Sequence, residues 1–249
     1  MHLLSELSRE LVSVWMGCNY RNVLKREFQS VLKVLEALDV EFEVVGEEMC
    51  CGFPVFIAGY TEDARRIGAE VLEALDGCRT VVTACPACMR GFRETYPSIG
   101  LKPRFETLHV TEFLDRVLSE RSYEFKPFEA SVMYHDPCEL GRHMGVYEEP
   151  RRVLKRIPGL KLVESRFNRE KSVCCGGGGL LPMFAPFLSP QVAVRKLLQE
   201  DEVKGRVDVV VTACPQCVSN LRSGVEEWGG DELRGLRVMD FCQLLKEVL

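Results

Sequence analysis

The sequence has no apolar stretch of the roughly 20 residues that a membrane-spanning helix needs. The nearest candidate, residues 180–194, is shorter and is interrupted by Pro182, Pro186 and Pro190. An excess of positive charge is missing as well, because 32 lysines and arginines stand against 37 aspartates and glutamates. These two absences argue against a membrane-spanning segment and against a nucleic acid partner.

The sequence also lacks the fingerprints of several common cofactors. It has no C-x2-C-x2-C-x3-C-P run, which is typical of ordinary cubane iron–sulfur clusters. It has no G-x-G-x-x-G turn for a flavin or nicotinamide dinucleotide and no G-x-x-x-x-G-K-[ST] phosphate loop. None of these cofactors is therefore expected to bind this chain through its usual motif.

What the sequence does have in abundance is cysteine, at 12 residues out of 249. A secreted disulfide framework is the first alternative to weigh. However, Glu6, Arg9 and Glu10 fall where the apolar core of a signal peptide would lie, and a chain of this length can bury a core without disulfides. A cytoplasmic protein with reduced thiols that bind metal is the favoured interpretation.

Ten of the cysteines form two matching sets of five. The first set has the pattern C-x31-CC-x33-C-x2-C and the second has C-x35-CC-x38-C-x2-C. The segments VVTACPACMRGF and VVVTACPQCVSNL repeat around the last pair of each set. The sets are Cys18, Cys50, Cys51, Cys85 and Cys88, and Cys138, Cys174, Cys175, Cys214 and Cys217. The chain is therefore expected to contain two homologous halves.

Each half alternates between predicted strands and predicted helices. In the first half, a short apolar run ends at Cys18. Further strands are expected at residues 40–45, 80–84 and 107–110, and helices at 21–38, 62–75 and 111–118. In the second half, strands are expected at 131–136, 160–164, 208–213 and 236–239, and helices at 149–156, 190–200 and 243–248.

This alternation predicts an α/β fold with two tandem homologous domains, residues 1–122 and 129–249, and a linker at residues 121–128. Each domain is expected to hold a small parallel sheet of about four strands flanked by helices, with pseudo-two-fold symmetry between the domains. Ligands bind at the carboxyl edge of a parallel sheet, and the ten cysteines follow the ends of predicted strands. Five thiols are therefore expected to meet at one edge of each domain.

Three interpretations of the five clustered cysteines compete. Structural zinc takes four ligands in a tetrahedron, which leaves one thiolate over in each half. A thioredoxin-like dithiol would use the C-P-x-C pairs but would leave the adjacent cysteines without a role. A multi-iron cluster uses all five, because soft thiolates select iron–sulfur centres and two adjacent cysteines can reach neighbouring irons. The iron–sulfur interpretation is favoured over the other two.

The residues around the cysteines suit an anionic cluster. Gly52 permits a tight bend after the first adjacent pair, and each C-P-x-C segment is expected to place a thiolate at the N-terminus of a helix. The glycine run at 176–179 is expected to let the chain approach closely and to supply N–H donors, with a mobile loop as the alternative.

Three further residues lie outside the repeated motif. Cys78 is expected to be a bystander at the opposite edge of its sheet, and Cys242 is expected to have a packing role. His135, in the segment Tyr-His-Asp-Pro-Cys, is the candidate catalytic residue, because it could donate protons near the second set of cysteines. A buried histidine that is hydrogen-bonded to the backbone is the alternative.

At these cysteine motifs the chain resembles the CCG-domain (cysteine-rich domain) family, CX31–39CCGX33–39CXXC, over nearly its whole length. Within the family it is most similar to the B subunit of heterodisulfide reductase. The resemblance implies two noncubane [4Fe–4S] clusters, one on each set of five cysteines, and a disulfide substrate that is cleaved in one-electron steps between them. The chain departs from many relatives at Glu139, where they have histidine. The two halves also differ after their adjacent cysteines, which suggests that only the second offers an open iron.

The resemblance further implies a catalytic subunit that reduces or forms a disulfide bond and receives electrons from partners. These would be a subunit with cubane clusters, similar to the C subunit, and a flavin-containing subunit, similar to the A subunit. Such a chain would be cytoplasmic and would reach a membrane only through its partners. The alternative is an electron-transfer or quinone-docking subunit of a glycolate, lactate or succinate dehydrogenase. A zinc-stabilised interaction module is the third hypothesis.

Overall fold

The chain forms two compact units, one ending at Glu124 and the other running from Phe125 to Leu249. The computed structural model describes residues 11–121 and 123–249. The domain boundaries at residues 1–122 and 129–249, and the linker between them, remain a prediction. Of the predicted linker, Lys126 and Phe128 donate backbone hydrogen bonds to the carbonyl oxygens of Val248 and Pro158, which belong to the second unit.

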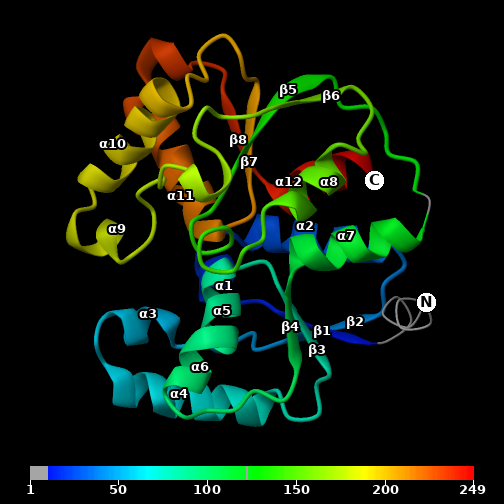
Figure 1. Cartoon of the computed structure of the whole chain (residues 1–249), viewed down its shortest axis with the longest axis vertical. Coiled ribbons are helices and arrows are strands. Elements are labelled where there is room, and N and C mark those ends of the chain that lie inside the picture. The colour runs from blue at the N-terminus through cyan, green and yellow to red at the C-terminus, as the bar shows by residue number, and fades with distance from the viewer. Residues whose placement is uncertain (1–10, 122) are drawn as a thin grey trace. The chain divides into compact units, whose positions relative to one another are not determined.

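The first unit contains four strands and the helices between them (Figure 1). Its strands are β1 (Val12–Trp15), β2 (Phe42–Val45), β3 (Thr80–Thr83) and β4 (Glu106–His109). Its α-helices are α1 (Cys18–Asn22), α2 (Lys25–Ala37), α3 (Phe53–Ile57), α4 (Thr61–Ala74), α5 (Pro86–Arg90), α6 (Tyr96–Ser98) and α7 (Val110–Glu120), and a π-helical turn, η1, covers Gly91–Thr95.

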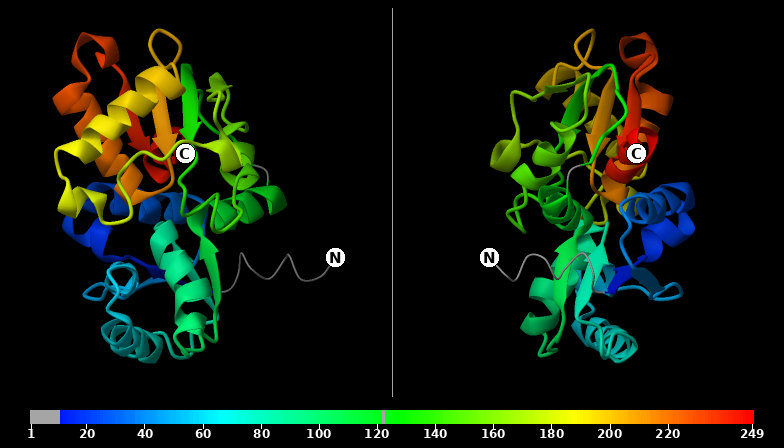
Figure 2. Two further views of the ribbon diagram at one scale, coloured as in Figure 1. Left: turned by 60° about the vertical axis from the view of Figure 1, so that its left-hand side comes forward. Right: turned by 90° about the vertical axis from the view of Figure 1, so that its right-hand side faces the viewer.

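The second unit has the same succession of strands (Figure 2). Its strands are β5 (Ala130–His135), β6 (Leu160–Val163), β7 (Val209–Thr212) and β8 (Arg237–Asp240). Its α-helices are α8 (Glu148–Leu154), α9 (Leu181–Phe184), α10 (Leu188–Arg195), α11 (Pro215–Ser223) and α12 (Phe241–Val248). Short 3-10 and π turns are η2 (Arg169–Lys171), η3 (Lys196–Glu200), η4 (Gly224–Trp228) and η5 (Gly230–Leu233).

Both sheets are parallel and share one strand order. The first runs β2-β1-β3-β4 and the second β6-β5-β7-β8. The α/β fold with two four-stranded parallel sheets is therefore confirmed. In this order β2 lies on one side of β1, and β3 and β4 lie on the other side. The direction of the connections therefore reverses at the switch point between β1 and β3, and likewise between β5 and β7. Ligands of open parallel sheets bind at the carboxyl ends of the strands beside such a switch point.

The central strands lie in the core of each unit because their residues are apolar on both faces. All four residues of β1, β3 and β7 are buried. Strands covered by helices on both faces read as continuous apolar runs instead of alternating ones, as VVVT in β7 does. Burial of the strands and of one stripe on each long helix holds the carboxyl edges of the sheets in place, and those edges carry the cysteines.

The structure differs from the sequence prediction in its short helices. The helix expected at 21–38 is broken at Val23 and Leu24, and the Val23 side chain is 62% exposed. The helix expected at 190–200 continues from α10 into the π turn η3. Helices α1, α3 and α9 were not predicted, because four or five residues are too few to show a helical period. Within the described residues no helix combines the length and the apolar character needed to cross a membrane.

Candidate metal centres

Five thiols of the first unit meet at the carboxyl edge of its sheet. Cys18 begins α1 just after β1, the adjacent pair follows β2, and Cys85 and Cys88 lie at the start of α5 after β3. The thiols form one continuous series, Cys18, Cys50, Cys51, Cys88 and Cys85, in which neighbouring side chains are close enough to interact. The Sγ atoms of Cys18 and Cys50 are 3.7 Å apart. Residues up to 70 positions apart therefore form one compact group of sulfur donors.

The second unit repeats this arrangement with its own five thiols. They form the same series of interacting side chains, Cys138, Cys174, Cys175, Cys217 and Cys214. The Sγ atoms of Cys175 and Cys217 are 3.3 Å apart. The structure thus brings together all ten predicted site cysteines, five in each unit, while their role as metal ligands stays a prediction.

Within each group, one thiol is held strongly in its thiolate form. Hydrogen bonds from Cys18 and Cys51 lower the pKa of Cys50 to about 3. Hydrogen bonds from Cys138 and Cys175 lower the pKa of Cys174 to about 2. The first cysteine of each motif shows the opposite effect, because its hydrogen bond to that thiolate raises its pKa well above the ordinary value. Each group therefore stabilises negative charge on one of its adjacent cysteines, and the thiolate is the form that binds metal.

Backbone N–H groups add to this stabilisation. The N–H groups of Gly176 and Gly177 donate to the Sγ atoms of Cys174 and Cys175, each at 3.4 Å. In the first unit, the backbone of Gly52 lowers the pKa of Cys50. Backbone groups at the start of α5 likewise help to lower the pKa of Cys85, after its hydrogen bond with Cys88. These N–H groups are unused by their helices or turns and favour an anion.

Side chains that the sequence analysis missed hold the adjacent cysteine pairs in place. In the first unit, the buried Tyr96 hydroxyl donates to the carbonyl oxygen of Cys51 at 3.0 Å. In the second, the Asn220 amide donates to the carbonyl oxygen of Cys175 at 2.7 Å. Ser189 links this contact to the glycine run, since its hydroxyl donates to Gly176 O at 2.9 Å and to Asn220 Oδ1 at 2.7 Å. No motif marks these residues, although each lies within eight positions of a C-P-x-C pair or in the helix facing it.

At the glycine run after Cys175, the backbone lies close to neighbouring segments of the chain. A Cβ atom on Gly177 would lie 2.7 Å from the carbonyl oxygen of Gln216, at the start of α11. Gly176 has φ +82°, and its Cβ would lie 2.9 Å from Val192 and 3.0 Å from Ser189 O. The prediction that this run lets the chain approach closely therefore has a structural basis at these two positions, while Gly178 has open space around it.

We expect Gly176→Ala to destabilise the second unit and to lower the retention of metal there. Left-handed backbone costs a non-glycine residue about 1–3 kcal/mol, and the new methyl group would also push against a backbone carbonyl. Gly178→Ala, in the same loop, is the matched control and should change the unfolding free energy by less than about 0.5 kcal/mol. Urea unfolding and metal analysis of the two variants measure the difference, and equal behaviour would contradict it.

The second unit also contains a buried ionic network that the sequence analysis did not predict. Arg151 on α8 is fully buried and donates to both carboxylate oxygens of Asp136, at 2.6 and 2.7 Å. It also donates to both oxygens of Glu164, at 2.7 and 2.9 Å, and stacks 5.2 Å from the Tyr134 ring centre. Asp136 lies two residues before Cys138, so this network sets the path of the chain into the second group.

The structure places His135 beside the second group of thiols. It is the last residue of β5, it is buried, and neither ring nitrogen has a hydrogen-bond partner among the described residues. A ring nitrogen and the Sγ atoms of Cys175 and Cys217 lie within 4.8 Å of one another. Burial lowers the pKa of His135 well below its ordinary value. The alternative of a histidine bonded to the backbone is therefore not what the structure has, and the proton-donor role stays a prediction.

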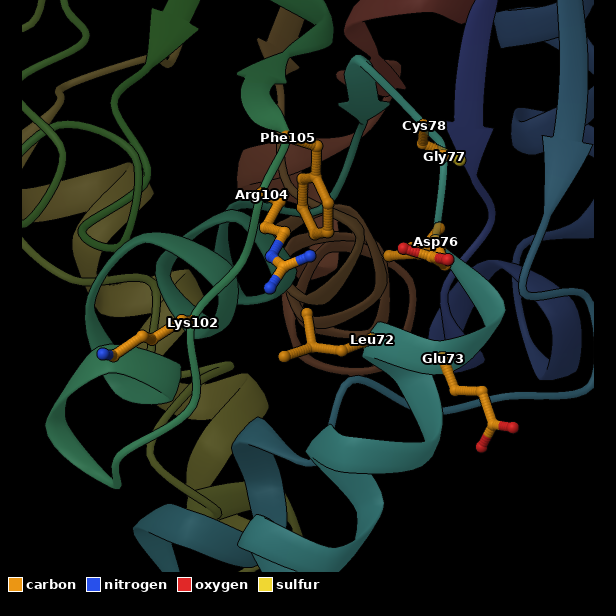
Figure 3. A pocket seen from close by; sticks show the side chains of 9 residues that line it. Leu72, Glu73, Asp76, Gly77, Cys78, Lys102, Arg104 and Phe105 are labelled. Atoms are coloured by element: carbon orange, nitrogen blue, oxygen red, sulfur yellow. The ribbon is translucent and has the colours of Figure 1, made fainter.

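The two remaining cysteines lie away from both groups. Cys78 accepts a hydrogen bond from the Ser13 hydroxyl at 3.1 Å, at the opposite edge of the first sheet. It lines a cavity of about 320 Å³ together with Asp76, Arg104 and Phe105 (Figure 3). Cys242 is buried at the start of α12, where Asp240 caps its backbone N–H at 2.8 Å. Neither thiol contributes to the groups of five.

The donor sets fit iron–sulfur clusters better than zinc. All five thiols of each group belong to one series of interacting side chains, so a tetrahedral zinc ion would leave one of them unused. Soft thiolates with backbone N–H groups around them are the usual surroundings of an anionic cluster of iron and sulfide. Most of the sulfurs are buried or half-buried, which limits access of water.

Comparison with known proteins agrees with this chemistry. A family model described as a cysteine-rich domain, CCG, matches residues 12–93 and again residues 132–222. The two matches correspond to the two sets of five cysteines. They also account for well over half of the chain.

Several characterised proteins are similar over most of the chain. The D subunit of dihydromethanophenazine:CoB–CoM heterodisulfide reductase from Methanosarcina barkeri is 36% identical, over 87% of this chain and 54% of its own length. The B subunit of fumarate reductase (CoM/CoB) from Methanothermobacter marburgensis is 33% identical, over 94% of this chain and 45% of its own. EtfAB:quinone oxidoreductase from Syntrophomonas wolfei is 28% identical, over 98% of this chain and 35% of its own.

The chain thus spans about half the length, or less, of these relatives. The heterodisulfide reductase relative is the D subunit, so the resemblance to the B subunit in particular is not supported. Two of these relatives are named as subunits of reductases and the third as an oxidoreductase.

Proposed function

This chain belongs to the cysteine-rich domain (CCG) family, and on that premise we propose that it is an iron–sulfur subunit that reduces or forms a disulfide bond. The observation that carries the proposal is the pair of matching thiol groups, five in each unit. The similarity to a heterodisulfide reductase subunit supports disulfide chemistry over other redox reactions. Reduction of one disulfide consumes two electrons and two protons and yields two thiols.

We propose that each group holds one [4Fe–4S] cluster of the noncubane type, as the B subunit of heterodisulfide reductase does. The ligands would be Cys18, Cys50, Cys51, Cys85 and Cys88 in the first unit, and Cys138, Cys174, Cys175, Cys214 and Cys217 in the second. When bound, the clusters supply the one-electron steps that sulfur–sulfur cleavage needs.

The residues around the second group favour it as the site of the reaction. Cys174 is exposed to solvent, whereas Cys175, Cys214 and Cys217 are buried. In the first group, Cys18 and Cys50 are only half-exposed and the other three are buried. A substrate therefore has better access to the second group. There, the N–H groups of Gly176 and Gly177 hold the ligand sulfurs in place, and the buried rear of the group excludes water.

The proposal includes partners, because the described fold offers no further cofactor motif. Electrons would come from a subunit with cubane clusters and, beyond it, a flavin-containing subunit. The relatives belong to multi-subunit reductases, which supports such a complex. A cytoplasmic location, with attachment to a membrane only through partners, is part of the same proposal.

A second candidate function is an electron-transfer subunit that docks to a quinone. One observation favours it: three large apolar side chains, Met183, Phe184 and Phe187, are 76–80% exposed just after the glycine run of the second group. An exposed apolar patch of this kind is typical of a docking surface. The similarity to EtfAB:quinone oxidoreductase is consistent with this alternative.

We expect protein prepared without oxygen to contain iron and acid-labile sulfide, with four of each per cluster and two clusters per chain. Metal analysis measures this directly. Zinc in place of iron, or iron without sulfide, would contradict the proposed cofactor.

Electron paramagnetic resonance during titration with thiols then separates the two functions. A paramagnetic signal that appears only with thiol supports disulfide chemistry. If thiols leave the spectrum unchanged and a quinone analogue alters it, the disulfide proposal is wrong.

A further inference from the structure

Two buried nitrogen donors occupy the same position in the two units. Trp15 ends β1 and His135 ends β5, and each precedes the first cysteine of its motif by three residues. In the parallel ladders, Trp15 pairs with Thr83 and His135 pairs with Thr212, each two residues before the C-P-x-C segment. The two residues therefore correspond in fold as well as in sequence position.

Both donors lie against the thiols of their unit. The nitrogen of His135 is within 4.8 Å of the Sγ atoms of Cys175 and Cys217. In the first unit, Trp15 Nε1 and Cys88 Sγ lie 3.6 and 3.3 Å from one shared point, the position that a Cβ atom on Gly17 would take. Cys88 is the counterpart of Cys217, so the same thiol is approached in both units.

Neither donor has a hydrogen-bond partner in the described part of the chain. Trp15 Nε1 and both ring nitrogens of His135 are buried and unpaired. An unpaired buried donor destabilises the fold, and most such groups in proteins have a partner. At both positions sulfur atoms lie close by. Each unit therefore has one buried nitrogen donor that lacks a hydrogen-bond partner and lies near the thiol group of that unit.

We propose that the N–H groups of Trp15 and His135 donate hydrogen bonds to the sulfur atoms of the metal centre in their own unit. This inference rests on the proposed iron–sulfur cofactor and adds two positioning residues to it. A hydrogen bond to an anionic sulfur stabilises the more negatively charged, reduced form. Trp15 and His135 then raise the reduction potential of the first and second centres, respectively.

The two donors are not chemically equal. The indole of Trp15 has one donor and no acceptor, so it can only donate. It is also fixed by edge-to-face packing, with its ring centre 5.3 Å from that of Phe92. The neutral imidazole of His135 has one donor and one acceptor nitrogen. The first centre therefore has a fixed donor, Trp15. The second centre has His135, which offers both a donor and an acceptor nitrogen, and it belongs to the group of thiols that is more exposed to solvent.

Trp15→Phe and His135→Phe test the inference in the full-length, iron-loaded chain. Each removes the N–H donor and keeps an aromatic ring. We expect the potential of the centre in the same unit to fall, with the ratio of reduced to oxidised centre about tenfold lower at a fixed potential, or about 59 mV for one electron. The centre of the other unit should not change. His135→Asn, which keeps an N–H donor, should restore part of the shift.

The measurement is a potential titration followed by electron paramagnetic resonance. Unchanged potentials in both Phe variants, with iron content intact, would overturn the inference while leaving the proposed cofactor standing. Absence of iron from the unchanged protein would instead overturn the cofactor. If His135→Phe loses the iron of its unit and His135→Asn does not recover it, His135 is a ligand and the donor assignment is wrong. The Trp15→Phe variant remains an independent test, because an indole N–H is a donor only and does not ligate iron.

Discussion

Replacing Cys175 by alanine should remove the metal centre of the second unit and leave that of the first. Cys175 lies in the middle of the series of interacting thiols, between Cys174 and Cys217, and its Sγ atom is 3.3 Å from that of Cys217. The five donors of the first unit come from another sheet. We therefore expect the variant to keep about half of the iron and sulfide of the unchanged protein, as one of two equal clusters would.

Cys242→Ala is the matched control for this change. It removes a buried cysteine from the same unit that lies outside the five thiols of the second group, so both centres should remain. Cys51→Ala is the corresponding variant of the first unit. It should lose the metal centre of the first unit and keep that of the second. Iron analysis and the spectra of the remaining centre distinguish the variants. Loss of all iron from Cys175→Ala would show that the two sets of ligands are not independent.

Replacing Arg151 by methionine should destabilise the second unit by about 3–5 kcal/mol, because removing one partner leaves buried charge uncompensated. The guanidinium of Arg151 is fully buried and makes four hydrogen bonds to the carboxylates of Asp136 and Glu164. Without it, the Asp136 carboxylate would depend on its bond from the backbone N–H of Arg169, at 2.8 Å. Because Asp136 immediately precedes the Pro137–Cys138 segment, we also expect weaker retention of iron in the second unit.

The neighbouring Arg152 provides the control. It is half-exposed and pairs with Glu149 at 2.8 Å, a surface contact worth about 0–1 kcal/mol. Arg152→Met should therefore unfold at nearly the same urea concentration as the unchanged protein. Unfolding of the two variants, followed by a spectroscopic signal from the second unit, measures the difference. Similar unfolding free energies for both variants would mean that the buried network does not stabilise this unit.

Much of the fold could be predicted because its signals are local. The central strands are buried on both faces and therefore appear as short apolar runs, such as TVVT at β3, found within one or two residues of the predicted range. Long helices such as α4 and α7 show an apolar stripe at helical spacing, and their bounds differ from the prediction by one to two residues. Short helices, which turn only once, lack such a stripe and were missed.

The residues of the two candidate metal centres divide in the same way. Cysteine is chemically distinctive and its repeat is long, so all ten predicted ligands could be named before any geometry was known. Tyr96, Asn220 and Arg151 could not, because tyrosine, asparagine and arginine are common and their roles depend on what each side chain reaches. Trp15 was missed for the same reason: its neighbour is a thiol 73 positions away along the chain.

The sequence by itself determined that this protein has two α/β halves, each with five cysteines at the ends of parallel strands. Local periodicity and a repeated pattern of a rare residue need no tertiary contact to be visible. Only the tertiary structure decided the strand order β2-β1-β3-β4, the order in which the thiols are linked, and the side chains that support them. Those features arise from packing between segments far apart in sequence, and similar apolar strands give no local sign of which neighbour each will take.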